Sequence, residues 1–487
     1  MSRNLRQRTI TGLFWSFVDN FAAQTIHFII GVILARLLSP TDFGLIGMIT
    51  IFISISQWFI SSGFGQALIR KQNCTQKDYS TVFIFNIITG VVLYLILFFL
   101  APFISNFFKE PELVLLLKIF GLNLIIISLT IVQKTQLTKR LDFKLQTRIS
   151  IISSIISGIV GITLALNGFG VWSLVYKSLV EYSLSSGLLW FLNKWRPSVI
   201  FSKKSFRELF GFGFKLMLRG LIYTLFNNVY YAVIGKYFST ATLGYYTKAE
   251  QFSNLPSSNI NKVVNRVTYP SLSELQEDRI ELKKVYKKMF TTLVFITSAP
   301  MILLCALAEP VIITLIGEKW RPSIIILQLL SVVGLLYPLC DFNLTVLKIV
   351  GNSSLILKLE IIKRILSIPI IVLGVKFGLN YLLLGIIILS TIEFMVNGYF
   401  SGKHISYSLR EQIEDIIPNI ILSLIVGIVV FIFSKYSGWS SIANLFSSLL
   451  IAFILIIGLS ELFRNKAYLS LKQILLVDIL RWKFNEE

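Results

Sequence analysis

The chain has 487 residues, of which 55% are hydrophobic and 15% are charged. Its mean hydropathy of +0.75 excludes an ordinary soluble protein, and recurring apolar segments of ~20 residues predict an all-α polytopic membrane protein. The net charge of +21 does not indicate nucleic-acid binding, because the basic residues gather in short loops between apolar runs.

Fourteen apolar segments are long enough to cross a membrane as helices. They are Ile10–Leu38, Thr41–Gln66, Tyr79–Phe107, Leu113–Gln133, Leu145–Leu166, Val171–Lys194, Phe206–Phe238, Thr242–Val264, Val285–Ile316, Ser323–Val350, Leu355–Val375, Tyr381–Phe400, Ile416–Phe433 and Ile442–Leu462. We interpret the first as a retained helix, because it is too long for a signal peptide. The polar stretch Leu272–Lys288 is interpreted as a linker, and Leu469–Trp482 as a helix on the membrane face.

Basic residues concentrate in every second connection, beginning with Arg3, Arg6 and Arg8 in the N-terminal tail. The positive-inside rule therefore predicts that both termini are cytoplasmic. Three cysteines and two histidines have no metal-ligand or disulfide spacing, so we expect no cofactor. No Walker A sequence and no long polar loop with acid or histidine residues is present, so we do not expect an enzyme.

A short pattern occurs twice, 200 residues apart. Ala35-Arg36-Leu37-Leu38-Ser39 with Gly44 corresponds to Gly235-Lys236-Tyr237-Phe238-Ser239 with Gly244. Each copy follows one long apolar run and opens another. The two halves are therefore expected to share one design.

Two cations, Lys215 and Arg219, lie one helical turn apart inside the run Phe206–Phe238. Tyr223, Asn227 and Tyr230 continue along or beside the same face, which suits a phosphate next to a sugar. Lys248, at the start of the next segment, is a third candidate for the phosphate. The alternative for Lys215 is that it reaches the interface as an anchor.

Asp19 and Glu181 are candidates for coupling transport to H⁺ or Na⁺, because a carboxylate inside a membrane helix can bind a cation. Asp19 has the alternative of a hydrogen bond to Asn20 or Gln24. Glu181 has the alternative of neutralising Lys177, four residues earlier. We interpret Glu360 and Arg364, with the same spacing, as such a pair.

Five motifs are spread along the chain: Leu38-Ser39-Pro40-Thr41-Asp42-Phe43-Gly44, Gly63-Phe64-Gly65-Gln66-Ala67-Leu68-Ile69, Gly244-Tyr245-Tyr246, Tyr269-Pro270-Ser271-Leu272-Ser273 and Gly317-Glu318-Lys319-Trp320-Arg321-Pro322. Together they resemble the polysaccharide flippases of the multidrug/oligosaccharidyl-lipid/polysaccharide exporter superfamily, in its O-antigen and exopolysaccharide branch. The resemblance runs from about Arg6 to Leu462.

The resemblance implies two pseudo-symmetric six-helix bundles, residues 1–200 and 201–410, two extra helices in 411–463 and a cytoplasmic tail in 464–487. It also implies alternating access around a central cavity. The expected function is flipping of an undecaprenyl-diphosphate-linked oligosaccharide, with membrane lipids and other polysaccharide-assembly proteins as partners. The alternatives are an ion-coupled drug or cation antiporter of the same superfamily and a membrane-embedded polysaccharide polymerase or ligase.

Overall fold

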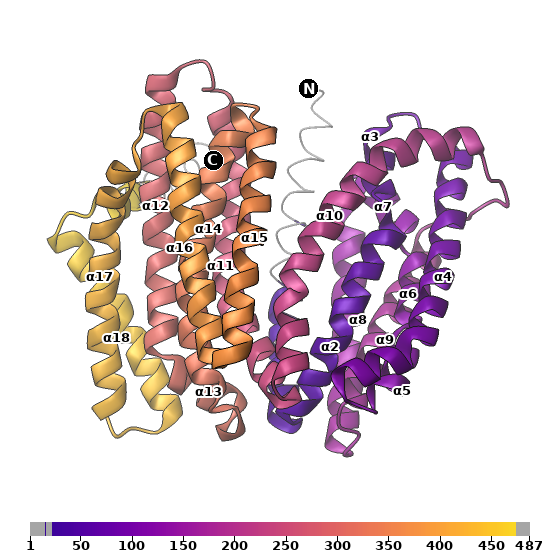
Figure 1. Ribbon diagram of the computed structural model, residues 1–487, viewed down its shortest axis with the longest axis horizontal. Coiled ribbons are helices and arrows are strands. Elements are labelled where there is room, and N and C mark those ends of the chain that lie inside the picture. Colours follow the sequence, from indigo (N-terminus) through magenta and orange to yellow (C-terminus); the bar gives the residue numbers. More distant parts are fainter. Residues whose placement is uncertain (1–14, 16–21, 474–487) are drawn as a thin grey trace, which may run out of the picture. The chain divides into compact units, whose positions relative to one another are not determined.

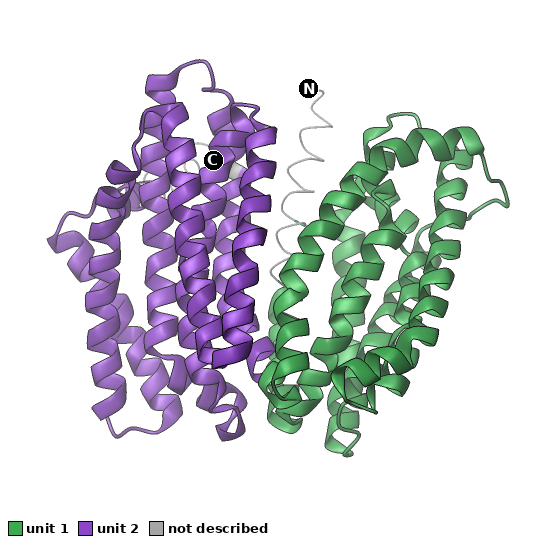
Figure 2. Ribbon diagram, in the orientation of Figure 1, with its two compact units in different colours: residues 1–244 green, residues 245–487 purple. Residues whose placement is uncertain are grey.

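The computed structural model describes Trp15 and residues 22–473, and every regular element within these residues is a helix (Figure 1). The chain forms two compact units, residues 1–244 and 245–487 (Figure 2). Each unit is a bundle of long helices. The predicted all-α polytopic fold is confirmed in these residues.

Unit 1 begins with the apolar helix Ala22–Leu37. It continues with α2 (Pro40–Ser61), α3 (Phe64–Arg70), α4 (Gln76–Phe108), α5 (Leu113–Phe120), α6 (Leu122–Ser128), α7 (Ile131–Lys139), α8 (Phe143–Leu166), α9 (Trp172–Leu192) and α10 (Lys203–Tyr237). Helix α11 (Thr240–Ser273) leads into unit 2. Unit 2 continues with α12 (Arg279–Ala306), α13 (Ala308–Ile316), the short 3₁₀ helix η1 (Glu318–Trp320), α14 (Ser323–Ile349), α15 (Ser353–Phe377), α16 (Leu379–Ile405), α17 (Leu409–Tyr436), α18 (Ser441–Leu462) and α19 (Lys466–Gln473).

Ten helical stretches among the described residues are long and apolar enough to cross a membrane. They coincide with ten of the fourteen segments predicted from the sequence. The predicted segments at α9, α11 and α15 also form helices, of 21, 34 and 25 residues, and these three contain many of the intramembrane charges. Of the first predicted segment, Ile10–Leu38, the described part forms the helix Ala22–Leu37.

The prediction of one helix over Val285–Ile316 is wrong. Helix α12 ends at Ala306 and α13 begins at Ala308, with Leu307 outside helical geometry at φ −99° and ψ 17°. Pro310 explains the break, because proline has no N–H to donate to the carbonyl four residues earlier and its ring collides with that carbonyl.

The polar linker predicted over Leu272–Lys288 is also wrong in extent. Helix α11 continues to Ser273, and α12 already begins at Arg279. The Asp278 side chain accepts hydrogen bonds from the Ile280 and Glu281 amides, both at 3.0 Å, and this capping starts α12 early. The predicted membrane-face helix Leu469–Trp482 is described only to Gln473, as part of α19, and its remainder lies outside the described residues.

The 200-residue repeat reappears as local structure. In each copy one helix ends and the next begins after a two-residue turn: Leu37 and Pro40 in the first, Tyr237 and Thr240 in the second. Ser39 accepts a hydrogen bond from the Asp42 amide, and Ser239 accepts one from the Thr242 amide. Both serines therefore cap the following helix in the same way.

Helix α10 packs closely on α2 within unit 1. A Cβ at Gly213 would come 2.5 Å from the Ser62 carbonyl oxygen, and a Cβ at Gly220 would come 2.3 Å from the Trp58 ring. Trp58 Nε1 donates a hydrogen bond of 2.6 Å to Thr224 Oγ1, one turn beyond Gly220. By packing, α10 belongs with unit 1, whereas the repeat makes it the first helix of the second half of the sequence.

We expect Gly220→Ala to destabilise the protein by about 1–3 kcal/mol, because the new methyl group collides with the Trp58 ring. Thermal unfolding in detergent measures this as a lower melting temperature. Gly211→Ala in the same helix is the matched control, since no atom lies within 4 Å of its Cβ position. Equal melting temperatures for the two variants would contradict the close packing of α10 on α2.

Candidate functional site

Most charges inside the apolar helices are paired. A charge at the bilayer centre costs ~2.5–3.5 kcal/mol on insertion scales, so an intramembrane carboxylate needs a partner or water. Examples in the described helices are Glu181 with Lys177 at 2.8 Å, Glu393 with Lys363 at 2.5 Å, Glu360 with Arg364 at 3.3 Å, and Asp341 with Lys348 at 3.3 Å. The pairs predicted for Glu181 and Glu360 are confirmed.

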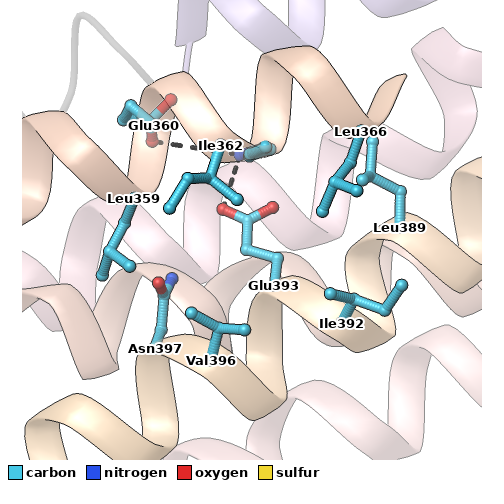
Figure 3. Close-up of a pocket in the computed structure, with 10 residues that line it drawn as sticks. Leu359, Glu360, Ile362, Leu366, Leu389, Ile392, Glu393, Val396 and Asn397 are labelled. Carbon is cyan, nitrogen blue, oxygen red and sulfur yellow. Dashed lines mark hydrogen bonds and ion pairs between the residues drawn. The ribbon is translucent and has the colours of Figure 1, made fainter. Parts of the chain in front are cut away.

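The charges on α15 and α16 border a small cavity (Figure 3). Lys363 is 2.5 Å from Glu393 and 3.9 Å from Glu360 Oε1, and Arg364 contacts Glu360 Oε2 at 3.3 Å. The cavity of about 20 Å³ holds at most one water molecule. The charges of two acidic and two basic side chains cancel here, so the cluster joins the two helices. The cavity is too small to bind a saccharide or a lipid headgroup.

Asp341 on α14 is a polar centre that the sequence reasoning missed. Its Oδ2 atom accepts hydrogen bonds from Asn261 Nδ2 at 3.0 Å and Asn265 Nδ2 at 2.6 Å, both on α11. Lys348 donates to Oδ1 at 3.3 Å. Asn261 and Asn265 are one helical turn apart where the predicted segment Thr242–Val264 ends, and this spacing could have indicated a shared polar partner.

One face of α10 carries four of the predicted site residues. Lys215, Arg219, Tyr223 and Asn227 follow one another at intervals of four residues, and all four side chains are exposed. This spacing places them along one side of the helix. We call this set the α10 stripe. The side of α10 with Gly213, Met217, Gly220 and Thr224 is buried, so packing on α2 orients the stripe away from the core of unit 1.

The two cations of the α10 stripe differ from the paired charges. Within the described residues, neither Lys215 nor Arg219 has a carboxylate within ion-pair distance. Arg219 presents a planar fork of N–H donors that matches the oxygens of a phosphate, and Lys215 adds a second positive charge one turn away. Tyr223 and Asn227 supply an aromatic face and an amide beyond Arg219, as a sugar requires.

The depth of the cations follows from the length of α10. Its 35 residues span about 52 Å, which exceeds the ~30 Å hydrocarbon core. Arg219 and Lys215 precede Tyr237 by 18 and 22 residues (237 − 219 and 237 − 215), or about 27 and 33 Å along the axis. These two lengths are close to the ~30 Å thickness of the hydrocarbon core, so a core boundary at the Tyr237 end would put the other boundary near the two cations. Both predicted roles of Lys215 stay predictions.

The other predicted site residues lie apart from this stripe. Tyr230 on α10 is half-buried. Lys248 is on α11 in unit 2, is 5% exposed, and donates a hydrogen bond of 3.1 Å to Gln251 Oε1. Glu181 is on α9, and Asp19 lies outside the described residues. The roles of all these residues stay predictions.

Sequence comparisons place the chain among polysaccharide biosynthesis proteins. The model of a family described as "Polysaccharide biosynthesis protein" matches residues 33–325, more than half of the chain. The teichuronic acid biosynthesis protein TuaB of Bacillus subtilis is 25% identical over 432 residues, covering 88% of this chain and 89% of that protein. The lipopolysaccharide biosynthesis protein WzxC of Escherichia coli is 23% identical over 441 residues, with the same coverage of 88% and 89%. The succinoglycan biosynthesis transport protein ExoT of Rhizobium meliloti is 26% identical over 381 residues, covering 78% and 77%.

Solved structures share the fold at lower identity. The lipid II flippase MurJ in an inward closed conformation has a TM-score of 0.73 at 17% identity, covering 93% of this chain and 98% of its own. An inward-facing multidrug resistance transporter of the MATE family has a TM-score of 0.62 at 16% identity, covering 79% and 94%. Both likenesses agree with the polytopic helical fold predicted from the sequence.

We expect Lys363→Met to destabilise the protein by about 3–5 kcal/mol, because Glu393 is left without its partner. Adding Glu393→Leu removes the stranded carboxylate and restores most of the melting temperature in detergent. Arg410→Met is the control, since it breaks an ion pair with Glu414 whose side chains are 90% and 58% exposed. A melting temperature for Lys363→Met as high as that of the control would contradict a structural role for this pair.

Proposed function

Because the chain belongs to the polysaccharide biosynthesis protein family, we propose that it is a flippase for an undecaprenyl-diphosphate-linked oligosaccharide. It moves this lipid across the bacterial inner membrane by alternating access, for export of a surface polysaccharide. The names of the relatives support this assignment, since they act in the biosynthesis or transport of teichuronic acid, lipopolysaccharide and succinoglycan. The shared fold with a lipid II flippase supports a lipid-linked substrate.

The α10 stripe is the observation that carries the proposal. A diphosphate-linked lipid has its negative charge at the headgroup level, its sugar on the water side and its prenyl chain in the hydrocarbon core. Arg219 and Lys215 are exposed cations at that level, without a carboxylate partner among the described residues. Arg219 binds the diphosphate with Lys215 beside it, and Lys248 is a further phosphate ligand. Tyr223, Asn227 and Tyr230 contact the sugar.

Two rival functions use different chemistry. A drug or cation antiporter has the support of a shared fold with a multidrug transporter, but the cations of the α10 stripe repel a cationic drug. A polymerase or ligase needs acid, base or metal groups near the reacting sugar. The described residues contain no group of three or more histidine, cysteine or carboxylate side chains that could hold a metal ion.

The orientation of the chain in the membrane, its partner proteins and the coupling ion complete the proposed function. Both termini are cytoplasmic, and the protein works beside other polysaccharide-assembly proteins. Transport is coupled to an ion gradient, with Asp19 and Glu181 as the carboxylates and H⁺ or Na⁺ as the ion.

Deletion of the gene tests the proposed function. The expected result is a diphosphate-linked oligosaccharide that accumulates in the cytoplasmic leaflet, and mass spectrometry of that lipid identifies the sugar. Sugar units that still reach the cell surface, without accumulation of the lipid, would favour the antiporter or the enzyme.

Arg219→Ala is expected to lower export by about tenfold or more, because a charge-assisted hydrogen bond to phosphate contributes about 1.5–3 kcal/mol. Complementation of the deletion strain measures export, and an immunoblot of the membrane fraction measures protein. Lys358→Ala is the matched control, since Lys358 is also an exposed cation on a long helix. Export by Arg219→Ala at the level of this control would refute the phosphate site.

Two substitutions of Tyr223 distinguish stacking of its ring on the sugar from a hydrogen bond of its hydroxyl group. We expect Tyr223→Phe to retain most export, because the aromatic face on which a sugar ring stacks is kept, and Tyr223→Ala to lose it. The same complementation assay measures both. Equal export by the two variants would mean that Tyr223 does not stack on the substrate.

A further inference from the structure

We propose that His27, beside Glu181 and Lys177, is a proton-binding site inside unit 1, and that the proton is the ion coupled to transport. The coupling rests on the proposed flippase function, whereas the proton site stands on the geometry alone. This site is separate from the α10 stripe.

Three helices build the site. His27 lies in the helix Ala22–Leu37, Ser154 in α8, and Lys177 and Glu181 in α9. His27 Nε2 is 3.4 Å from Glu181 Oε1 and 3.3 Å from Ser154 Oγ. Lys177 Nζ is 2.8 Å from Glu181 Oε2. Glu181 therefore faces a basic group with each of its two oxygens.

Two glycines of α8 allow the three helices to meet here. A Cβ at Gly158 would come 2.2 Å from Ile30 Cδ1, one turn beyond His27. A Cβ at Gly161 would come 3.0 Å from the Lys177 Cβ atom. The small surface of α8 thus brings the first helix close and packs the stem of Lys177 so that its ammonium group reaches Glu181.

The charge balance identifies His27 as the group that changes charge. Lys177 and Glu181 cancel each other, so the cluster is neutral with a neutral imidazole and carries +1 with a protonated one. Histidine is the side chain whose ordinary pKa lies in the physiological range. Ser154 Oγ stabilises both states, because a hydroxyl can donate to Nε2 or accept from it. Glu181, which only accepts when ionised, favours the protonated state.

No other described charge competes for this position. Within the described residues, Glu181 is the carboxylate at ion-pair distance from His27, and His27 and Lys177 are the basic groups at that distance from Glu181. The remaining ionisable groups on the elements that pack around it are Arg36 on the first helix, Lys144 and Arg148 on α8, Tyr176 and Tyr182 on α9, Lys118 on α5 and Lys134 and Lys139 on α7. Lys118 Nζ lies over the Phe98 ring at 4.4 Å.

The cluster fits a proton better than Na⁺. A hard metal cation needs several oxygen ligands, and Glu181 supplies two that already face an ammonium group and an imidazole. The Lys177 ammonium at 2.8 Å repels an incoming metal ion. The His27 side chain is 41% exposed and that of Glu181 23%, so neither group is enclosed within unit 1.

The chain has two histidines, which makes the site directly measurable. In His404→Gln, His27 is the remaining histidine, and ¹⁵N-histidine NMR follows its protonation in vesicles of phosphatidylethanolamine and phosphatidylglycerol. We expect His27 to bind and release a proton as the pH of the vesicle suspension is varied. Glu181→Gln in this background lowers the ratio of protonated to neutral His27 by about tenfold or more, and Lys177→Met raises it, since each removes one nearby charge.

Transport in vesicles tests the coupling. The probe is a short-chain polyprenyl diphosphate that carries N-acetylglucosamine, and the readout is the ratio of flipping rates with and without an imposed pH gradient. We expect this ratio to exceed one in the wild-type protein and in His404→Gln, and to fall to one in His27→Gln.

The possible outcomes separate the two ideas. A His27 whose protonation does not change throughout the titration, or charge variants that leave its protonation unchanged, would overturn the proton site even if flipping occurs. A pH response that persists in His27→Gln but disappears in Asp19→Asn would assign coupling to Asp19 and overturn the role of His27. Absence of flipping of the probe and of the natural lipid by the wild-type protein would refute the flippase, while the NMR titration still decides the proton site.

Discussion

The cost of an unneutralised charge in a membrane governs this structure. Carboxylates in the described helices, such as Glu181, Asp341 and Glu393, meet it with basic partners from the same or a neighbouring helix. Lys215 and Arg219 have no such partner among the described residues. Under the proposed function, the diphosphate of the substrate neutralises them. The same constraint would then separate the charges that join helices from those that bind a ligand.

The position of the α10 stripe depends on a close helix contact. Gly213 and Gly220 let α10 approach α2, and the hydrogen bond from Trp58 to Thr224 fixes which side of α10 is buried. The opposite side is then free to present Arg219 and its neighbours. In the same way, Gly158 and Gly161 of α8 bring His27 and Lys177 to Glu181. In both places small residues allow the helices to approach, and this close packing determines where the candidate side chains lie.

Features that depend on neighbours in the sequence were predictable. The apolar runs predicted the helices, and the two copies of one turn indicated the repeat. Spacing by four residues predicted the pairs Lys177–Glu181 and Glu360–Arg364 and the common face of the α10 stripe. Contacts across helices were not predictable in this way. His27 and Glu181 are 154 residues apart (181 − 27), and Asp341 meets asparagines on another helix. The packing of α10 with the first unit likewise depends on shape complementarity, which hydrophobic periodicity does not report.

The end of unit 1 at Gly244 bears on how the chain is synthesised. Helices leave the ribosome in order, and domains tend to fold as they emerge. Helix α10 packs on α2, α3 and α4, all of which precede it, so unit 1 has its packing partners once residue 244 has been added. The remaining 243 residues (487 − 244) need about 12–50 s at 5–20 residues per second. A nascent chain interrupted after residue 200 would lack α10 and leave the side of α2 with Trp58 open to lipids or to chaperones, whereas one interrupted after residue 244 would contain all helices of unit 1.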